Sequence, residues 1–169
     1  MAAILEQFNK NPFLKKFYIN HRNAFNTQIF FLLIRYKKQV CVNKNNKYIV
    51  SDYDLYKDFI FANINLKKKR IKCYKRLYNI LFINFKINKI HIYLKASLSI
   101  IKKRIQKRGR SFEKSIELHY LKKITKSYNK YYSANNALPV IIINNSKLNL
   151  EYHKFIINYI LSIILKIYK

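Results

Sequence analysis

The chain has 169 residues and a mass of 20.6 kDa, which predicts one domain over residues 1–169. Half of the residues are hydrophobic, which excludes wholesale disorder, and the net charge is +28. Such a charge normally indicates a nucleic-acid partner. However, Lys, Ile, Asn, Tyr and Phe make up 102 residues, as an A·T-rich gene would produce, so we expect only nonspecific nucleic-acid binding.

The residue counts exclude several kinds of site. A glycine-rich phosphate loop needs at least two glycines, and these 169 residues contain only Gly109. The two cysteines, Cys41 and Cys73, lie too far apart in sequence for a C-x-x-C motif, and we expect a cytoplasmic protein. The longest apolar stretch, 155–165, is shorter than the roughly 20 residues of a membrane span, so we expect no membrane partner.

The first half of the chain alternates β-like runs with helical stretches. Apolar runs at 2–6 and 47–50 predict strands, and Asn11-Pro12 is typical of a helix start with proline at the first helical position. Apolar residues that recur at intervals of three and four predict helices over 24–42, 55–65 and 66–85.

The second half continues this alternation. Residues 89–96 predict a buried strand through Ile90, Ile92 and Leu94. Further helices are expected over 98–108, ending at Gly109, over 115–132, and over 150–168, the last of them buried, with a strand at 140–143. Strands separated by helices predict an α/β fold with a parallel sheet.

Acidic residues are scarce, so their placement is informative. Asp52, Asp54 and Asp58 follow the predicted strand at 47–50, where α/β folds bind ligands and Mg²⁺. Asp54 and Asp58 are interpreted as first-turn residues of the next helix, favoured there by the helix dipole. Asp52 remains as the candidate for a phosphate or Mg²⁺ site.

Three of the seven arginines gather around Gly109. Arg104 and Arg108 are four residues apart on one helix face, and Arg110 follows the turn. Three guanidinium groups at one turn suit a transferring phosphoryl group. The alternative is a solvated basic helix end. We favour function, because this lysine-rich chain places arginines here.

Four other polar residues are weaker candidates. Glu6 ends the first predicted strand and could be a general base or an ordinary surface acid. Tyr18, Gln28 and Arg35 interrupt apolar helices, and Gln28 and Arg35 are two turns apart on one face. An amide can read the edge of a base, but such residues also cap helices or extend to solvent.

Together these stretches resemble the deoxynucleoside kinase family. The resemblance covers residues 6 to 149 and rests on 6–18 with its E-x-x-x-x-N-P, on 24–39, 51–62 and 90–97, and on 104–116 with its R-x-x-x-R-G-R. It implies a three-layer parallel sheet of the P-loop nucleoside and nucleotide kinase type. It also implies transfer of the γ-phosphoryl group of ATP, with Mg²⁺, to the 5′-hydroxyl of a purine deoxynucleoside.

The resemblance assigns roles to the candidate residues. Glu6 matches the general base, Tyr18 and Glu113 the residues that hold the sugar 3′-hydroxyl, and Gln28 and Arg35 the residues that read the base. The lid arginines that clamp the phosphates match Arg104, Arg108 and Arg110. Family members are commonly dimers through the helices near 24–42 and 66–85, so we expect self-association.

The chain departs from the family in three ways. The family's first strand, P-loop and helix precede the strand that ends in Glu6, so we expect an N-terminally truncated domain with little turnover alone, whose phosphate loop a separate or fused chain supplies. The family's acid-Arg-Ser/Thr reads Ser51-Asp52-Tyr53, with Asp52 in place of the arginine. Lys57 falls where several members have a base-binding Asp. A non-catalytic nucleoside-binding remnant therefore remains an alternative, with a basic nucleic-acid-binding protein ranked last.

Overall fold

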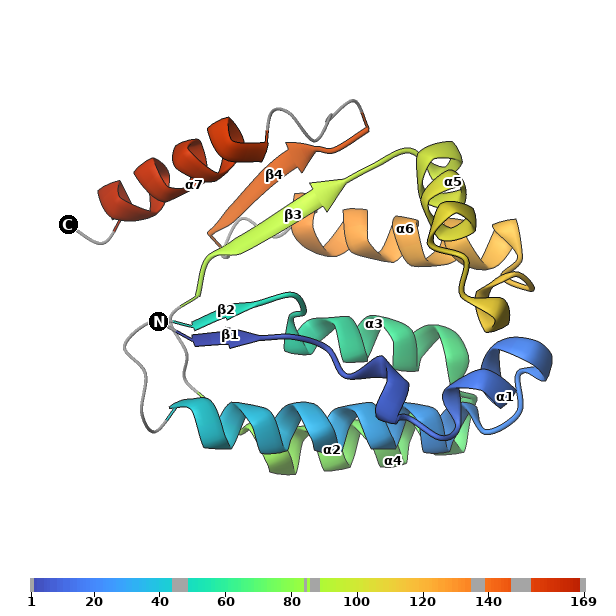
Figure 1. Ribbon diagram of the computed structural model, residues 1–169. Helices are drawn as coiled ribbons and strands as arrows, with labels where there is room; N and C mark the ends of the chain where they lie inside the picture. Colours follow the sequence, from blue (N-terminus) through green and yellow to red (C-terminus); the bar gives the residue numbers. More distant parts are fainter. Residues whose placement is uncertain are drawn as a thin grey trace.

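Short strands alternate with helices in the computed structural model, which describes residues 2–43, 49–83, 85, 89–134, 139–146 and 153–167 (Figure 1). The strands are β1 (Ala2–Ile4), β2 (Ile49–Ser51), β3 (His91–Lys95) and β4 (Val140–Asn144). The helices are α1 (Leu14–Asn20), α2 (Ala24–Asn43), α3 (Leu55–Asn65), α4 (Lys68–Phe82), α5 (Leu98–Arg108), α6 (Leu118–Ala134) and α7 (His153–Ile167), with 3₁₀ turns η1 (Phe8–Lys10) and η2 (Ser111–Glu113). Every predicted strand and helix is present.

The strands form two parallel pairs. β1 pairs with β2, and β3 pairs with β4, which confirms an α/β fold with parallel strands. Within the described residues β2 and β3 share no ladder, so the strands form two separate parallel pairs. Side chains link the two pairs instead: Asp54, just after β2, accepts a hydrogen bond from Tyr132 of α6 and pairs with Lys89 just before β3.

Local signals fix the ends of the helices. The Ser97 hydroxyl accepts a hydrogen bond from the Ile100 N–H at the start of α5, and Gly109 ends that helix with a φ of 72°. At α1 the expectation was one turn early. Asn11 Oδ1 accepts a hydrogen bond from the Phe13 N–H, so Pro12 lies in the turn before the helix starts at Leu14.

Two apolar clusters hold the helices around the β1–β2 pair. In the first, Leu32 of α2 packs with Ala62 of α3 and Tyr74 of α4, and Figure 1 shows α2 and α4 side by side below the β1–β2 pair. In the second, Leu14 and Phe17 of α1 pack against Tyr120 of α6. The second cluster brings the first helix of the chain beside the segment that follows Gly109.

Two burial predictions are wrong. Ile92 and Leu94 of β3 are 42% and 54% exposed, because the face that packs on α6 carries His91 and Tyr93 instead. The C-terminal helix exposes its apolar residues, with Phe155 73% exposed, because α7 lies at the outside of the molecule (Figure 1). No helix within the described ranges is both long and apolar enough to cross a bilayer.

Candidate active site

A cavity of about 230 Å³ opens between the end of β1, helices α1, α2 and α3, and the turn after α5. It is larger than the roughly 150 Å³ that accommodates a benzene ring. Seven of the nine predicted site residues line it: Glu6, Tyr18, Gln28, Arg35, Arg108, Arg110 and Glu113. The structure therefore collects in one place residues that lie up to 107 positions apart in the chain.

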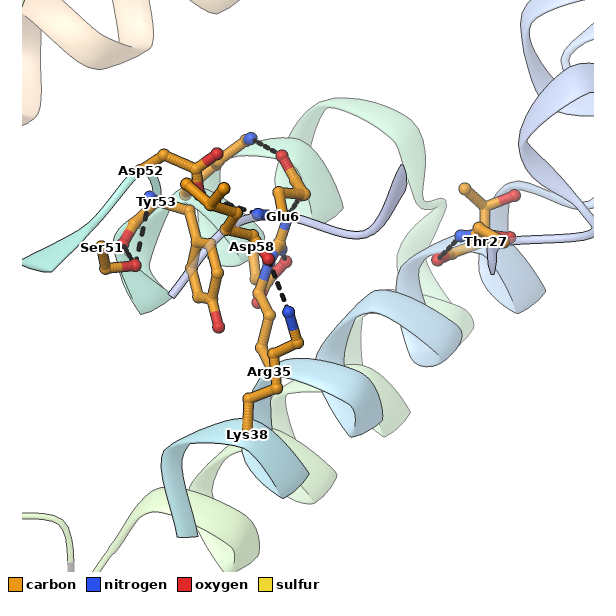
Figure 2. Close-up of polar contacts among 11 residues, drawn as sticks. Glu6, Thr27, Arg35, Lys38, Ser51, Asp52, Tyr53 and Asp58 are labelled. Atoms are coloured by element: carbon orange, nitrogen blue, oxygen red, sulfur yellow. Dashed lines mark hydrogen bonds and ion pairs between the residues drawn. The ribbon is translucent and has the colours of Figure 1, made fainter. Parts of the chain in front are cut away.

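Arg35 is the centre of a buried ionic network. Its Nη2 contacts Glu6 Oε1 and its Nη1 contacts Asp58 Oδ1, as Figure 2 shows. The guanidinium also lies 4.9 Å from the centroid of the Phe31 ring and 5.0 Å from that of Tyr53. Burial lowers the pKa of Arg35 to about 10, so it stays charged at neutral pH. Arg35 is 4% exposed, which rules out the interpretation that it extends to solvent.

Asp58 corrects the sequence interpretation in part. It lies in the first turn of α3, as expected, but it is 1% exposed and faces Arg35, so it does more than favour the helix dipole. Lys57, which the resemblance matched to a base-binding Asp, is its neighbour in the chain. The clue in the sequence was that Asp58 lies four residues before Ala62, which places both on one face of α3, and Ala62 is fully buried.

Lys57 contacts the other oxygen of Glu6. Its Nζ lies 2.5 Å from Glu6 Oε2, and its side chain is 24% exposed at the cavity. Burial, with the nearby charge of Arg35, lowers the pKa of Lys57 to about 7, against the opposing effect of Asp52. Asp52 also holds the backbone, since its Oδ1 accepts a hydrogen bond of 2.8 Å from the Glu6 N–H.

The turn after α5 contributes two arginines bound to one buried acid. Arg108 donates hydrogen bonds of 3.0 and 2.6 Å to Glu113 Oε2, and Arg110 donates one of 3.1 Å to Oε1. Glu113 is 6% exposed. The Arg110 guanidinium lies 3.5 Å from the centroid of the Phe8 ring. Glu113 therefore aims both guanidinium groups into the cavity.

Tyr18 of α1 borders the same end of the cavity. Its ring stacks on Phe112 at 5.9 Å, and its carbonyl accepts a hydrogen bond of 2.9 Å from the Ser115 hydroxyl. Burial, with contributions from Tyr120 and Glu113, raises the pKa of Tyr18 well above its usual value. The phenol therefore stays protonated at physiological pH and can donate a hydrogen bond.

Gln28 and Thr27 of α2 border the cavity farther along, and both are buried. The Thr27 carbonyl accepts a hydrogen bond of 3.1 Å from the Asn11 side chain, which ties α2 to the turn before α1. Among the described residues, Thr27 Oγ1 and Asp58 Oδ2 are buried polar atoms without a hydrogen-bond partner. Buried polar groups are normally paired, so these atoms suit a polar ligand.

Two predicted residues do not line the cavity. Arg104 donates a hydrogen bond of 2.7 Å to the carbonyl of Asn145, just after β4, so it does not converge with the other two arginines. Asp52 is exposed beside Glu6. In the described part of the chain, no three His, Cys, Asp or Glu side chains cluster as ligands for a metal ion. Mg²⁺ in such sites is usually held by one or two carboxylates together with substrate phosphates, and Asp52 would supply one such carboxylate.

Sequence comparison decides the family. The family model described as deoxynucleoside kinase matches residues 2–166. The chain belongs to the deoxynucleoside kinase family. It is 38% identical over 130 residues to a deoxyguanosine kinase of Bacillus subtilis (strain 168), covering 74% of this chain and 63% of that enzyme, so it spans less than two thirds of that relative's length. A deoxyadenosine/deoxycytidine kinase of the same bacterium is 32% identical over 146 residues, covering 81% of this chain and 67% of that one.

Solved structures agree. Deoxyadenosine kinase from M. mycoides with bound dCTP superposes with a TM-score of 0.82 at 27% identity, over 95% of this chain and 85% of that one. The same enzyme with bound dATP gives a TM-score of 0.79 at 28% identity, over 94% and 85% of the two chains. This family member therefore has the P-loop kinase fold of those enzymes.

Proposed function

We propose that this chain binds a deoxynucleoside in the cavity and takes part in transferring the γ-phosphoryl group of ATP to its 5′-hydroxyl. The observation that carries the proposal is that one cavity is lined by Glu6, Arg35, Asp58, Arg108 and Arg110, with Arg35 paired to both Glu6 and Asp58. This reaction needs a general base for the hydroxyl proton, polar side chains that bind the nucleobase, and cations that bind the phosphates.

Glu6 is the proposed general base. Its carboxylate would accept the proton of the 5′-hydroxyl while that oxygen bonds to the γ phosphorus. ATP supplies the phosphoryl group when it is bound, and the bond between the γ phosphorus and its bridging oxygen breaks, so that ADP leaves. Asp52 fixes the backbone of Glu6 by its hydrogen bond to the Glu6 N–H.

The purine is proposed to lie between Phe31 and the wall of α3, against Gln28. An amide offers both a donor and an acceptor to a base edge, and the unpaired Asp58 Oδ2 offers a further acceptor. The sugar would lie toward Tyr18 and Glu113. By their names, the relatives from Bacillus subtilis act on deoxyguanosine or on deoxyadenosine and deoxycytidine, and the M. mycoides enzyme binds dATP and dCTP, which supports a deoxynucleoside as the ligand.

These 169 residues supply only part of a binding site for the phosphates of ATP. Arg108 and Arg110 are proposed to clamp the phosphates, and Asp52 is proposed to bind Mg²⁺. The sequence holds one glycine, Gly109, and it ends α5, so it forms no glycine-rich loop. We propose that the loop comes from a fused or separate chain, and that two copies associate through α2 and α4.

Phosphoryl transfer and binding should be measured together. Each of the four deoxynucleosides is incubated with Mg²⁺ and γ-labelled ATP, and its binding is measured separately by calorimetry. We expect saturable binding, strongest for purines. Where turnover is measurable, Glu6→Gln should lower kcat by about 10²- to 10⁴-fold and leave nucleoside affinity within a few-fold. Glu117→Gln, which removes an exposed acid, is the matched control.

The alternative, a non-catalytic nucleoside-binding remnant, gives a different pattern. It predicts nucleoside binding that Gln28→Leu abolishes, with no labelled product under any condition. The absence of binding to any deoxynucleoside would reject both functions.

A further inference from the structure

Each oxygen of the Glu6 carboxylate contacts a cation in this structure. Arg35 contacts Oε1, and the ammonium of Lys57 lies 2.5 Å from Oε2. A general base must offer a lone pair to the proton that it accepts, and a carboxylate oxygen keeps a lone pair beside a single hydrogen bond. A cation that moves away would open the approach of a bound nucleoside to that oxygen.

The two cations are held very differently. Arg35 also pairs with Asp58, lies between the Phe31 and Tyr53 rings, and is 4% exposed. Lys57 is 24% exposed, and among the described residues its ion pair is with Glu6. Its flexible four-carbon stem makes it the cation that can move.

The surroundings of Lys57 favour an anion. Arg108 and Arg110 line the same cavity, and the charges of Arg35 and Arg108 both lower the pKa of Lys57, as does its burial. Charges of one sign in a partly buried site repel one another, and a bound phosphate would relieve that repulsion. Glu6, Asp58 and Glu113 line the same cavity and oppose these positive charges, and Asp52 raises the pKa of Lys57.

We propose that Lys57 exchanges partners during the reaction: it holds Glu6 Oε2 in the free protein and binds phosphoryl oxygens when the nucleotide is present. This inference rests on the proposed function. The exchange releases Oε2 for the 5′-hydroxyl and adds an ammonium group to the clamp formed by Arg108 and Arg110. Lys57 is thus a positioning residue for Glu6 and a ligand of the phosphate.

The test compares two ligands that differ by one phosphate. The affinities of a purine deoxynucleoside and of its 5′-monophosphate are measured by calorimetry on the full chain. The wild type should bind the monophosphate more tightly. Lys57→Met should reduce that preference by about 10- to 100-fold, the usual effect of losing one charge-assisted hydrogen bond, and leave nucleoside affinity within three-fold. Lys57→Arg should restore most of the preference.

Lys38→Met is the matched control, because it removes the same charge at a position that does not line the cavity. The ammonium of Lys38 donates a hydrogen bond to the Leu5 carbonyl. This control should leave the preference unchanged. If Lys57→Met does not fold, Lys57→Gln is measured in the same way. A preference that survives in the Lys57 variants overturns the partner exchange and leaves the proposed function standing. If the wild type binds neither ligand, the proposed function fails and the inference fails with it.

Discussion

Removal of the buried carboxylate of Asp58 should destabilise the protein strongly. Asp58 is 1% exposed and its partner Arg35 is 4% exposed, so Asp58→Asn leaves a buried guanidinium that still pairs with Glu6. Breaking a buried ion pair from one side costs about 3 to 5 kcal/mol. Because Glu6 still compensates Arg35, we expect the lower end, about 3 kcal/mol.

That free energy translates into a measurable shift. For a chain of this length, about 3 kcal/mol lowers Tm by roughly 6 to 12 °C. The assay is thermal and urea unfolding followed by circular dichroism. Glu117→Gln is the control, because it removes the same charge from a side chain that is 58% exposed. Its effect should stay within about 0.5 kcal/mol.

A double-mutant cycle separates the ion pair from other effects. Arg35→Met combined with Asp58→Asn removes both charges, and its cost should be smaller than the sum of the two single costs by at least about 1 kcal/mol. A Tm change under 2 °C for Asp58→Asn, or strictly additive costs, would refute the claim that these groups are paired in the folded protein.

Three further predictions concern other parts of the fold. Burial lowers the pKa of His91 below its usual 6.5, against the opposing charge of Asp54. The unfolded chain therefore binds a proton before the folded one does, so stability should fall as pH drops from 7.5 to 5.5. In urea titrations, His91→Gln should flatten that slope, and an unchanged slope would contradict the assignment. Leu32→Ala, at a fully buried position, should cost about 2 to 5 kcal/mol by urea unfolding, and a cost under 1 kcal/mol would show that the site is not packed. Gly109→Ala should cost about 1 to 2 kcal/mol in the same assay, because φ is positive at this position. The added Cβ would not clash, since it would lie 4.0 Å from the Lys107 carbonyl oxygen. A neutral change would argue against the left-handed turn.

The order of strands and helices could be predicted because each signal is local. Ser97, the periodic apolar residues of α5 and Gly109 define that helix within a dozen positions. The exposure of Ile92 and Leu94 could not be predicted, since an apolar run has the same appearance whichever face another element covers.

The candidate site divides in the same way. The cluster of Arg108, Arg110 and Glu113 is compact in sequence, and its local geometry follows from the turn at Gly109. The pairing of Arg35 with Asp58 joins two helices. From the sequence, the resemblance matched the base-binding Asp to the neighbouring residue, Lys57. Only the packing of α3 on α2 decides which of these neighbours faces the arginine.

The most direct test of the nucleoside site is to map a ligand on the protein by NMR. A purine deoxynucleoside is titrated into ¹⁵N-labelled protein at physiological salt, and the amide shifts are followed. The account predicts saturable shifts confined to residues around Thr27, Gln28 and Arg35 and to the turn at Glu113, persisting when the salt is doubled. Shifts absent there, or spread over the lysine-rich surface and lost as salt rises, would contradict it.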